Sequence, residues 1–350
     1  MIRYDDLLLN LFHLIENERS MSSIYHLLKG KKSSQTIQDA YLFQMENSYG
    51  ILKNLSKQHF TEAVQRLADK QLITIEKEQI YLTDQGRRRV LQLDQSMFVL
   101  LKGHIYHKSD HLFKDTLLLL FQTVSMLIQK QNRFIPIVDQ PYVQTKVKKI
   151  LLAYRKNVKQ LADQLFEELY RTLSVVPDQS ATLFMQQFSG YQRIGKSMQQ
   201  LADHTGWMKE DIHLHTFVVV HQMMSIIEQK REDFPLLSNL IEKHSSRLTA
   251  SAQRTQELFH AGKAFDEIVE IRNLKESTIQ DHFIEMATYH IDFPIHDFLP
   301  DDKLKRVLEV IQHAETKKLK PIKELVGEDI SYFQIRLAIA VINQRKKVSV

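Results

Sequence analysis

Basic side chains at helical spacing in the middle of the chain are the first candidates for chemistry. Residues 142–173 read as one long helix, and a stripe of Lys and Arg along it could follow a phosphate backbone. A solvated helix face with i,i+4 ion pairs has the same pattern and is the more common explanation. The candidate DNA-binding residues of this helix fall on two adjacent faces: Lys148, Arg155 and Lys159 on one, Lys149 and Lys156 on the next.

A second candidate is the segment Phe265–Ile279, which has the pattern of two helices joined by a tight turn. Ile268 faces inward on the first helix, and Asn273 occupies the turn, where Asn tolerates the left-handed conformation better than most residues. The second helix then buries Ile279 and Phe283. This helix-turn-helix spacing indicates nucleic-acid transactions rather than metabolic chemistry.

The helix predicted over residues 276–290 carries three acids and no Lys or Arg. Helices that read a DNA groove need donors for phosphates and purine edges, so a protein-binding or structural use is favoured. Residues 246–350 also have equal numbers of basic and acidic side chains, which fits docking on a protein. The candidate DNA contacts here are Arg272, Lys275 and Gln280; Asp281 and Glu285 are expected to be exposed and are candidate partner-binding residues.

Catalytic signatures are missing from the sequence. It has no Gly-x-x-x-x-Gly-Lys loop, no Gly-x-Gly-x-x-Gly and no His-Glu-x-x-His, and it contains only 9 glycines. His104, His107 and His111 are predicted to share one helical face, but no carboxylate in register completes a metal site. We therefore expect a non-enzyme without cofactor or metal.

The N-terminal part has the order of a winged helix. Ser56 is predicted to cap a helix over residues 57–70, and a β-hairpin follows near residues 72–82. Thr83 is placed to cap the next helix, whose early turns contain Arg87–Arg89.

The central part repeats the helix-turn-helix offsets. Ala202, Gly206 and Ile212 have the same spacing as Val269, Asn273 and Ile279, and Gly206 can adopt a positive φ at the turn. His213 and His215 then fall on its second helix. A helix over 113–129 is apolar nearly all round and is expected to be buried.

Composition sets the broad class. The 350 residues include 47 Lys and Arg against 42 Asp and Glu, and no Cys, which fits a reducing cytoplasm. The longest uninterrupted apolar runs are far shorter than a bilayer span, so no membrane contact is expected. We predict a mainly α, multi-domain protein with helix-turn-helix units and one small hairpin: a winged-helix-like domain over 1–100, a central helical domain over 101–245 and a helix-turn-helix domain over 246–350.

The last hundred residues resemble a known domain. The stretches that carry the resemblance are Thr255-x-x-Leu258-Phe259-x-x-Gly262, Phe265-Asp266-Glu267-Ile268-Val269-x-x-Arg272-x-Leu274, Thr278-Ile279-x-x-His282-Phe283 and Leu319-Lys320-Pro321-Ile322-Lys323-Glu324 with Gly327-Glu328. They are similar to the helicase-type helix-turn-helix domain at the C-terminus of many RecQ-type DNA helicases. Over its whole length the chain resembles the YpbB family, bacterial proteins encoded beside a RecQ-type helicase that lacks this domain.

The resemblance implies a non-catalytic accessory protein that binds a RecQ-type helicase, DNA or both during replication, recombination or repair. Two alternatives remain open. A transcription regulator would use the same helix-turn-helix units as a dimer with sequence preference. A structural adaptor would bind proteins without contacting DNA.

Overall fold

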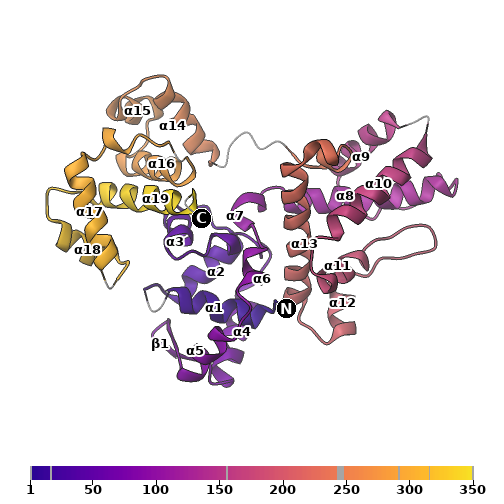
Figure 1. Ribbon diagram of the computed structural model, residues 1–350, viewed down its shortest axis with the longest axis horizontal. Helices are drawn as coiled ribbons and strands as arrows, with labels where there is room; N and C mark the ends of the chain where they lie inside the picture. The colour runs from indigo at the N-terminus through magenta and orange to yellow at the C-terminus, as the bar shows by residue number, and fades with distance from the viewer. Residues whose placement is uncertain are drawn as a thin grey trace. The chain divides into compact units, whose positions relative to one another are not determined.

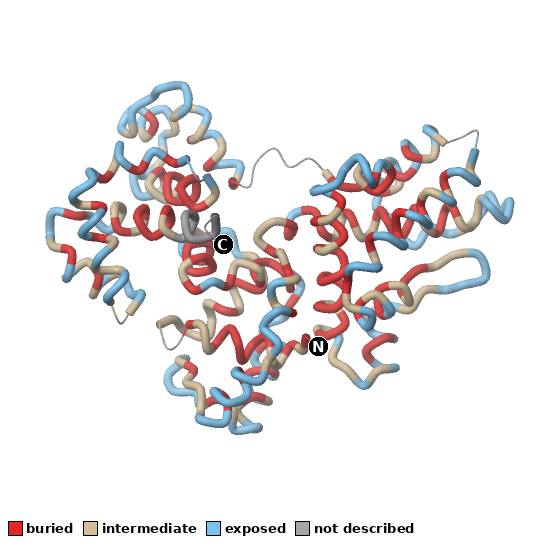
Figure 2. The backbone as a smooth tube through the Cα atoms, viewed as in Figure 1, coloured by how far each residue is buried: buried red, intermediate tan, exposed pale blue. Residues whose placement is uncertain are grey.

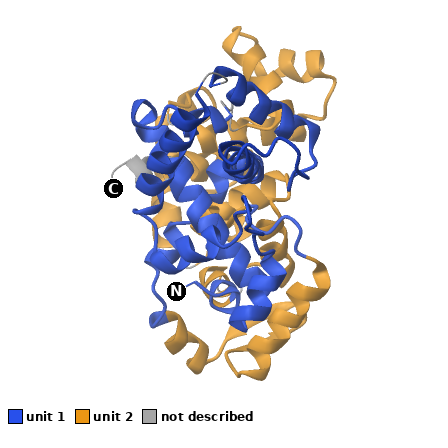
Figure 3. Cartoon of the chain, turned by 90° about the vertical axis from the view of Figure 1, so that its right-hand side faces the viewer, with its two compact units in different colours: residues 1–8, 50–55, 91–243 blue, residues 9–49, 56–90, 244–350 orange. Residues whose placement is uncertain are grey.

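The computed structural model describes residues 2–15, 18–154, 157–242, 248–290, 292–314 and 316–348, with the side chains of 343–348 outside the description. The chain divides into two compact units (Figure 3). Unit 1 contains residues 1–8, 50–55 and 91–243, and unit 2 contains residues 9–49, 56–90 and 244–350. Helix α1 (Tyr4–Ile15) contains the first of these boundaries. The residues predicted as one N-terminal domain are thus divided between the units, and the three-domain division stays a prediction.

The fold class is confirmed. The described residues are mainly helical, and their one sheet is an antiparallel hairpin of β1 (Ile73–Glu76) and β2 (Gln79–Leu82), which pairs Ile73 with Leu82 and Glu76 with Gln79. This is the hairpin predicted near residues 72–82.

Unit 1 is built around one buried helix, α13 (Lys209–Gln229), which packs against α8, α10, α11 and α12 (Figures 1 and 2). Apolar side chains line several of its faces, so neighbours must cover it on all sides. The other helices are α6 (Ser96–Val99), α7 (Gly103–Tyr106), α8 (Asp110–Ile128), α9 (Pro141–Ala153), α10 (Val158–Leu173), α11 (Asp178–Met185) and α12 (Met198–Thr205), with 3₁₀ turns η2 (Arg231–Asp233) and η3 (Leu237–Leu240).

Helix α8 is also long and apolar enough, by length and composition alone, to cross a membrane. This is the helix predicted over 113–129, which was expected to be apolar nearly all round and buried. Half of the apolar window is buried inside unit 1, where α8 packs against α9, α10 and α13. Core helices of folded domains have the same composition.

Unit 2 also has a buried central helix, α16 (Glu276–Tyr289), which packs against α3, α14 and α19. At its middle, the Phe283 ring lies 5.0 Å from the ring centres of Phe259 and Phe298. The remaining elements are α2 (Met21–Lys29), α3 (Ser34–Leu42), η1 (Glu46–Ser48), α4 (Lys57–Asp69), α5 (Asp84–Leu91), α14 (Ala250–His260), α15 (Phe265–Arg272), η4 (Ile295–Asp297), α17 (Asp301–His313), α18 (Leu319–Val326) and α19 (Tyr332–Val348).

Candidate nucleic-acid interface

The C-terminal helix-turn-helix forms as its spacing predicts. Helix α15 ends at Arg272, Asn273 takes the left-handed conformation with φ of 47°, and α16 begins three residues later. Ile268, Ile279 and Phe283 are each 0% exposed. Two features therefore fix the turn: the left-handed conformation of Asn273, which Asn tolerates, and the packing of these three buried apolar side chains.

The second helix of this motif lies inside the unit. From His282 to Thr288 every residue of α16 is buried, as the red helix in Figure 2 shows. Base edges are read by side chains that stand free on a helix entering the major groove. The middle and end of α16 have no such free face in unit 2, so this helix is a core helix.

Burial also changes the roles of the two acids on α16. Glu285, predicted to be exposed, is 7% exposed; its carboxylate accepts hydrogen bonds from the Thr249 backbone N (2.5 Å) and from Thr249 Oγ1 (3.0 Å). The predicted exposure is wrong, because α14 and its N-terminal cap cover this position. Asp281 is half-exposed and forms an ion pair of 2.8 Å with Arg336 of α19. A partner-binding role for Asp281 stays a prediction.

The three candidate DNA contacts around the turn differ in availability. The Arg272 guanidinium donates to Ser251 O (2.8 Å), Ser251 Oγ (3.1 Å) and Thr255 Oγ1 (2.6 Å), which ties α15 to α14. Gln280 donates to Glu276 (2.8 Å) on its own helix. Lys275 is exposed at the start of α16. Of the three, Lys275 is the best placed to reach a phosphate.

The central basic stripe does not have the predicted geometry. The helix expected over 142–173 is two helices, because α9 ends at Ala153 and Asn157 caps α10 by accepting a hydrogen bond from Gln160 N (2.9 Å). Both helices pack on α8. The shared face predicted for Lys148 and Lys159 is therefore wrong, although Lys148, Lys149 and Lys159 are all exposed. Arg155 and Lys156 lie outside the described residues.

The central helix-turn-helix also forms, with Gly206 at φ of 67° between α12 and α13. An N-terminal segment of unit 1 braces the turn: Asp211 accepts hydrogen bonds from Tyr4 N (2.7 Å) and Arg3 (3.1 Å), and the Arg3 guanidinium lies 3.6 Å from the Trp207 ring centre. Since α13 is buried, its role is to hold unit 1 together.

The histidines of α13 make structural contacts. His215 is 1% exposed and pairs with Ser180 Oγ (2.7 Å) and Ile2 O (3.1 Å), and burial lowers its pKa to about 4. His213 Nε2 lies 2.7 Å from Ile51 O, and burial lowers its pKa to about 3. Neutral imidazoles in these positions satisfy backbone carbonyls.

The three histidines near residue 107 do not share a helical face. His104 lies in α7, His107 is the residue that ends α7, and His111 lies in α8. His107 Nδ1 lies 2.8 Å from Gly103 O, and burial lowers the pKa of His107 to about 4. The predicted common face is wrong because the chain turns between the two helices. Within the described ranges no three His, Asp or Glu side chains are grouped to hold a metal.

The face that the sequence analysis did not single out lies on α4. Ser56 caps this helix as predicted, accepting a hydrogen bond from His59 N (3.1 Å). One stripe is buried, and the opposite side presents exposed polar side chains: Lys57, Gln58, His59, Thr61, Glu62, Gln65 and Asp69. The 3.6-residue spacing of the buried Phe60, Ala63, Val64 and Leu67 is the signal that could have identified this face.

The hairpin follows α4 and contacts it through β1, and α5 comes next in the chain. The turn between β1 and β2 places Lys77 and Glu78 at positive φ (46° and 67°). Thr83 Oγ1 accepts from Gly86 N (3.0 Å), which confirms the predicted cap. A Cβ on Gly86 would lie 2.0 Å from Leu72 O, so glycine lets α5 close against the hairpin. The exposed arginines Arg87, Arg88 and Arg89 follow.

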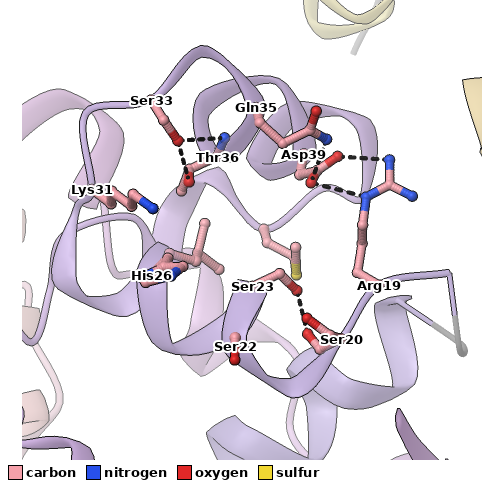
Figure 4. Close-up of a pocket in the computed structure, with 12 residues that line it drawn as sticks. Arg19, Ser20, Ser22, Ser23, His26, Lys31, Ser33, Gln35, Thr36 and Asp39 are labelled. Atoms are coloured by element: carbon pink, nitrogen blue, oxygen red, sulfur yellow. Dashed lines mark hydrogen bonds and ion pairs between the residues drawn. The ribbon is translucent and has the colours of Figure 1, made fainter. Parts of the chain in front are cut away.

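A polar hollow of about 390 Å³ lies beside α2 and α3 (Figure 4). Figure 4 shows Arg19 and Asp39 pointing toward each other; Arg19 donates to both carboxylate oxygens of Asp39 (2.9 and 2.8 Å), and Gln35 adds a third hydrogen bond (2.9 Å). Burial and the nearby Lys31 lower the pKa of His26. Asp39 thus accepts three hydrogen bonds, two of which tie α3 to Arg19.

Comparisons with known proteins agree with the helix-turn-helix assignment. Residues 251–339 match a family described as a helix-turn-helix domain. Over 344 residues the chain is 29% identical to Protein YpbB of Bacillus subtilis (strain 168), in an alignment that covers 96% of each protein. No solved structure matches. The likeness to YpbB thus extends over nearly the whole chain.

Proposed function

We propose that this chain is a non-catalytic accessory protein that binds DNA and works with a RecQ-type helicase in replication, recombination or repair. The helix-turn-helix match over residues 251–339 and the likeness to YpbB support a role connected with DNA. The observation that carries the proposal is the exposed polar face of α4 beside its hairpin.

Helix α4 has the features that a groove-reading helix needs. Its apolar stripe is buried in unit 2, so its orientation is fixed while the opposite face stays exposed to solvent. Gln58 and Gln65 donate to Glu62 (2.8 Å) and Asp69 (2.9 Å) on the same exposed face, and they can exchange these bonds for adenine edges. Lys57 can reach guanine or a phosphate. The helix begins at an exposed cap, and the first turns of recognition helices are the part that meets the bases.

The hairpin and α5 supply phosphate contacts next to this helix. Lys77 lies at the hairpin turn, and Arg87, Arg88 and Arg89 are exposed on α5. Phosphate contacts position a protein on the duplex without reading its sequence. Glu62, Asp69 and neighbouring acids partly offset these charges, so binding is expected to be moderate and strongly salt-dependent.

The helicase part of the proposal draws on unit 2 as well. Residues 246–350 have no net charge, and α16 is buried, so this helix-turn-helix is better suited to docking on a protein than to reading DNA. The same observation favours the adaptor alternative, in which the chain binds the helicase and no DNA at all.

A pair of charge reversals tests DNA binding. Lys57 and Lys209 are both exposed and both begin a helix, α4 and α13 respectively. Lys57→Glu should weaken duplex binding and reduce its salt dependence, measured by fluorescence anisotropy across salt concentrations, whereas Lys209→Glu should leave both unchanged. Equal effects would show that α4 is not the contact face.

The same assay tests the basic residues of α9 and α10, which the sequence predicted as DNA contacts. Lys148→Glu combined with Lys159→Glu reverses two exposed charges of unit 1. A larger loss than that of Lys57→Glu would move the DNA contact to α9 and α10.

Capture of a purified RecQ-type helicase by the full chain tests the proposed protein partner. Capture without DNA binding would support the structural adaptor instead.

A further inference from the structure

The loop between α11 and α12 carries an unusual surface. Figure 1 shows this loop of unit 1 extending away from α11 and α12. At its tip, residues 191–194 are all exposed, and Ile194 is 93% exposed, the highest value among the described large apolar side chains. Single exposed apolar side chains are common on protein surfaces, so the surroundings of Ile194 decide whether it has a use.

The loop is nevertheless held in one conformation. Gly190 and Arg193 exchange two backbone hydrogen bonds of 2.9 and 3.1 Å, which close the tip. Tyr191 N donates to Ser125 Oγ (3.0 Å), and the Arg193 guanidinium donates to Met185 O (3.0 Å). These bonds anchor the tip to α8 and α11, so little conformational freedom is lost when it binds.

Two of the chain's 9 glycines stand where the loop approaches its neighbours most closely. A Cβ on Gly195 would lie 2.2 Å from the Gln187 backbone O, and one on Gly190 would lie 2.6 Å from Ser125 Oγ. The first contact is with backbone and cannot be relieved by a rotamer change. The loop conformation therefore depends on glycine at position 195.

The charges of this region have one sign. Between Asp178 and Asp203, Arg193 and Lys196 are the charged residues, and both are cations. Tyr191, 39% exposed, adds a ring on which a base can stack. Cations beside an exposed aromatic and an exposed aliphatic side chain match the chemistry of nucleic acid, where apolar wedges enter between base steps and cations meet phosphates.

We propose that this loop is a wedge that inserts Ile194 at the junction of duplex and single-stranded DNA, with Arg193 and Lys196 toward the phosphates. The proposal rests on the DNA binding proposed above. A junction is the favoured position because its terminal base step has already lost one neighbour, which lowers the cost of unstacking. With only two cations the loop contributes preference for DNA structure rather than most of the affinity.

Binding of the full chain to a fork and to a blunt duplex of the same sequence tests the wedge. Ile194→Ala should reduce the fork preference roughly fivefold, because alanine is too short to enter between base steps, while duplex affinity stays the same. The matched control is Ile135→Ala, which removes another isoleucine of unit 1 that is 88% exposed. Gly195→Ala keeps Ile194 but displaces the loop, and it should lower the fork preference as well; its thermal unfolding checks that unit 1 still folds.

The outcomes separate the wedge from the proposed function. If duplex and fork binding persist but Ile194→Ala leaves the fork preference unchanged, the wedge is overturned and DNA binding stands. If the unaltered chain binds no DNA, both are overturned. If Ile194→Ala abolishes helicase capture and not fork preference, the loop is a protein-docking element, and an equal effect of Ile135→Ala also overturns the wedge.

Discussion

Helices α4 and α16 of unit 2 differ in how much of their surface is buried. Helix α16, the second helix of the C-terminal helix-turn-helix, is buried by α3, α14 and α19. Helix α4 is buried along one stripe, and its opposite side is exposed to solvent. The turn before α16 fixes how two helices cross. The number of other elements that pack on the second helix determines which of its sides stays exposed. Three helices cover α16.

Composition of the two helices explains the difference. On α16 the apolar residues Ile279, Phe283, Ile284, Met286 and Ala287 cover nearly half of the circumference, a wider arc than on α4. The other half carries the buried polar residues His282, Glu285 and Thr288, so no single neighbour can cover the helix. On α4 the apolar residues form one stripe. A helix-turn-helix spacing therefore identifies a motif, and the distribution of apolar residues around its second helix determines whether that helix can meet DNA.

The largest expected effect comes from a matched pair of threonines. Thr61 on α4 and Thr288 on α16 each donate to the carbonyl four residues earlier, at 2.9 and 2.7 Å, but Thr61 is exposed and Thr288 is 2% exposed. Thr288→Lys should cost roughly 5 kcal/mol or unfold unit 2, because it buries an unpaired charge. Thr61→Lys should change stability by less than about 0.5 kcal/mol. Chemical denaturation followed by circular dichroism compares them, and similar losses would contradict the assigned burial.

The apolar centre of α16 gives the next largest effect. Phe283→Ala should destabilise unit 2 by roughly 3–5 kcal/mol, because it removes a ring packed against other phenylalanines and leaves a cavity. Leu325→Ala on α18 is the control, since Leu325 is 64% exposed. A loss below about 1 kcal/mol for Phe283→Ala would mean that α16 is not the core helix.

Unit 1 offers a pH test of its own buried helix. Burial lowers the pKa of His215 to about 4 from the ordinary 6.5, so the unfolded chain binds a proton between these values and the folded chain does not. The free energy of unfolding of unit 1 is therefore highest above pH 6.5, and it falls by roughly 1–3 kcal/mol as the pH decreases toward 4. Trp207, the single Trp, lies beside His215 and reports this unfolding by fluorescence.

His215→Gln should reduce the pH dependence between pH 6.5 and 4 without abolishing it, because burial also lowers the pKa of His107 to about 4 and that of His213 to about 3. His204→Gln, on the exposed side of α12, is the control and should keep it. An unchanged slope in His215→Gln would show that other groups carry the acid sensitivity.

The smallest expected effect concerns the buried acid of α16. Glu285→Gln should cost about 1–2 kcal/mol, because it replaces the charged acceptor of the hydrogen bonds from Thr249 N and Oγ1 with a neutral amide, which makes weaker bonds. Glu257→Gln on the exposed side of α14 should be neutral. Wild-type stability for Glu285→Gln, measured by thermal unfolding, would restore Glu285 as a surface residue available to a partner.

Local signals predicted local structure well. The cap at Ser56, the hairpin near residues 72–82, and the turns at Gly206 and Asn273 all form, because each depends on residues within a few positions of one another. The predicted helix over 142–173 is wrong. Asn157 caps a second helix there, and this local signal was not identified from the sequence.

The candidate site was harder to predict than the fold. Exposure was assigned to Glu285 from its charge alone, yet the charge is satisfied by the cap of α14, 36 residues earlier in the chain. The face of α4 was readable from its single apolar stripe. Contacts between residues distant in sequence leave no local pattern, so the cover over Glu285 could not be inferred.

By itself the sequence determined the helical class, the hairpin and both helix-turn-helix turns, since these follow from side-chain spacing and backbone preferences of nearby residues. Only the tertiary structure decided which elements cover each buried helix. Burial of α13 and α16 results from the summed packing of helices far apart along the chain, and the same packing leaves α4 and the loop around Ile194 exposed.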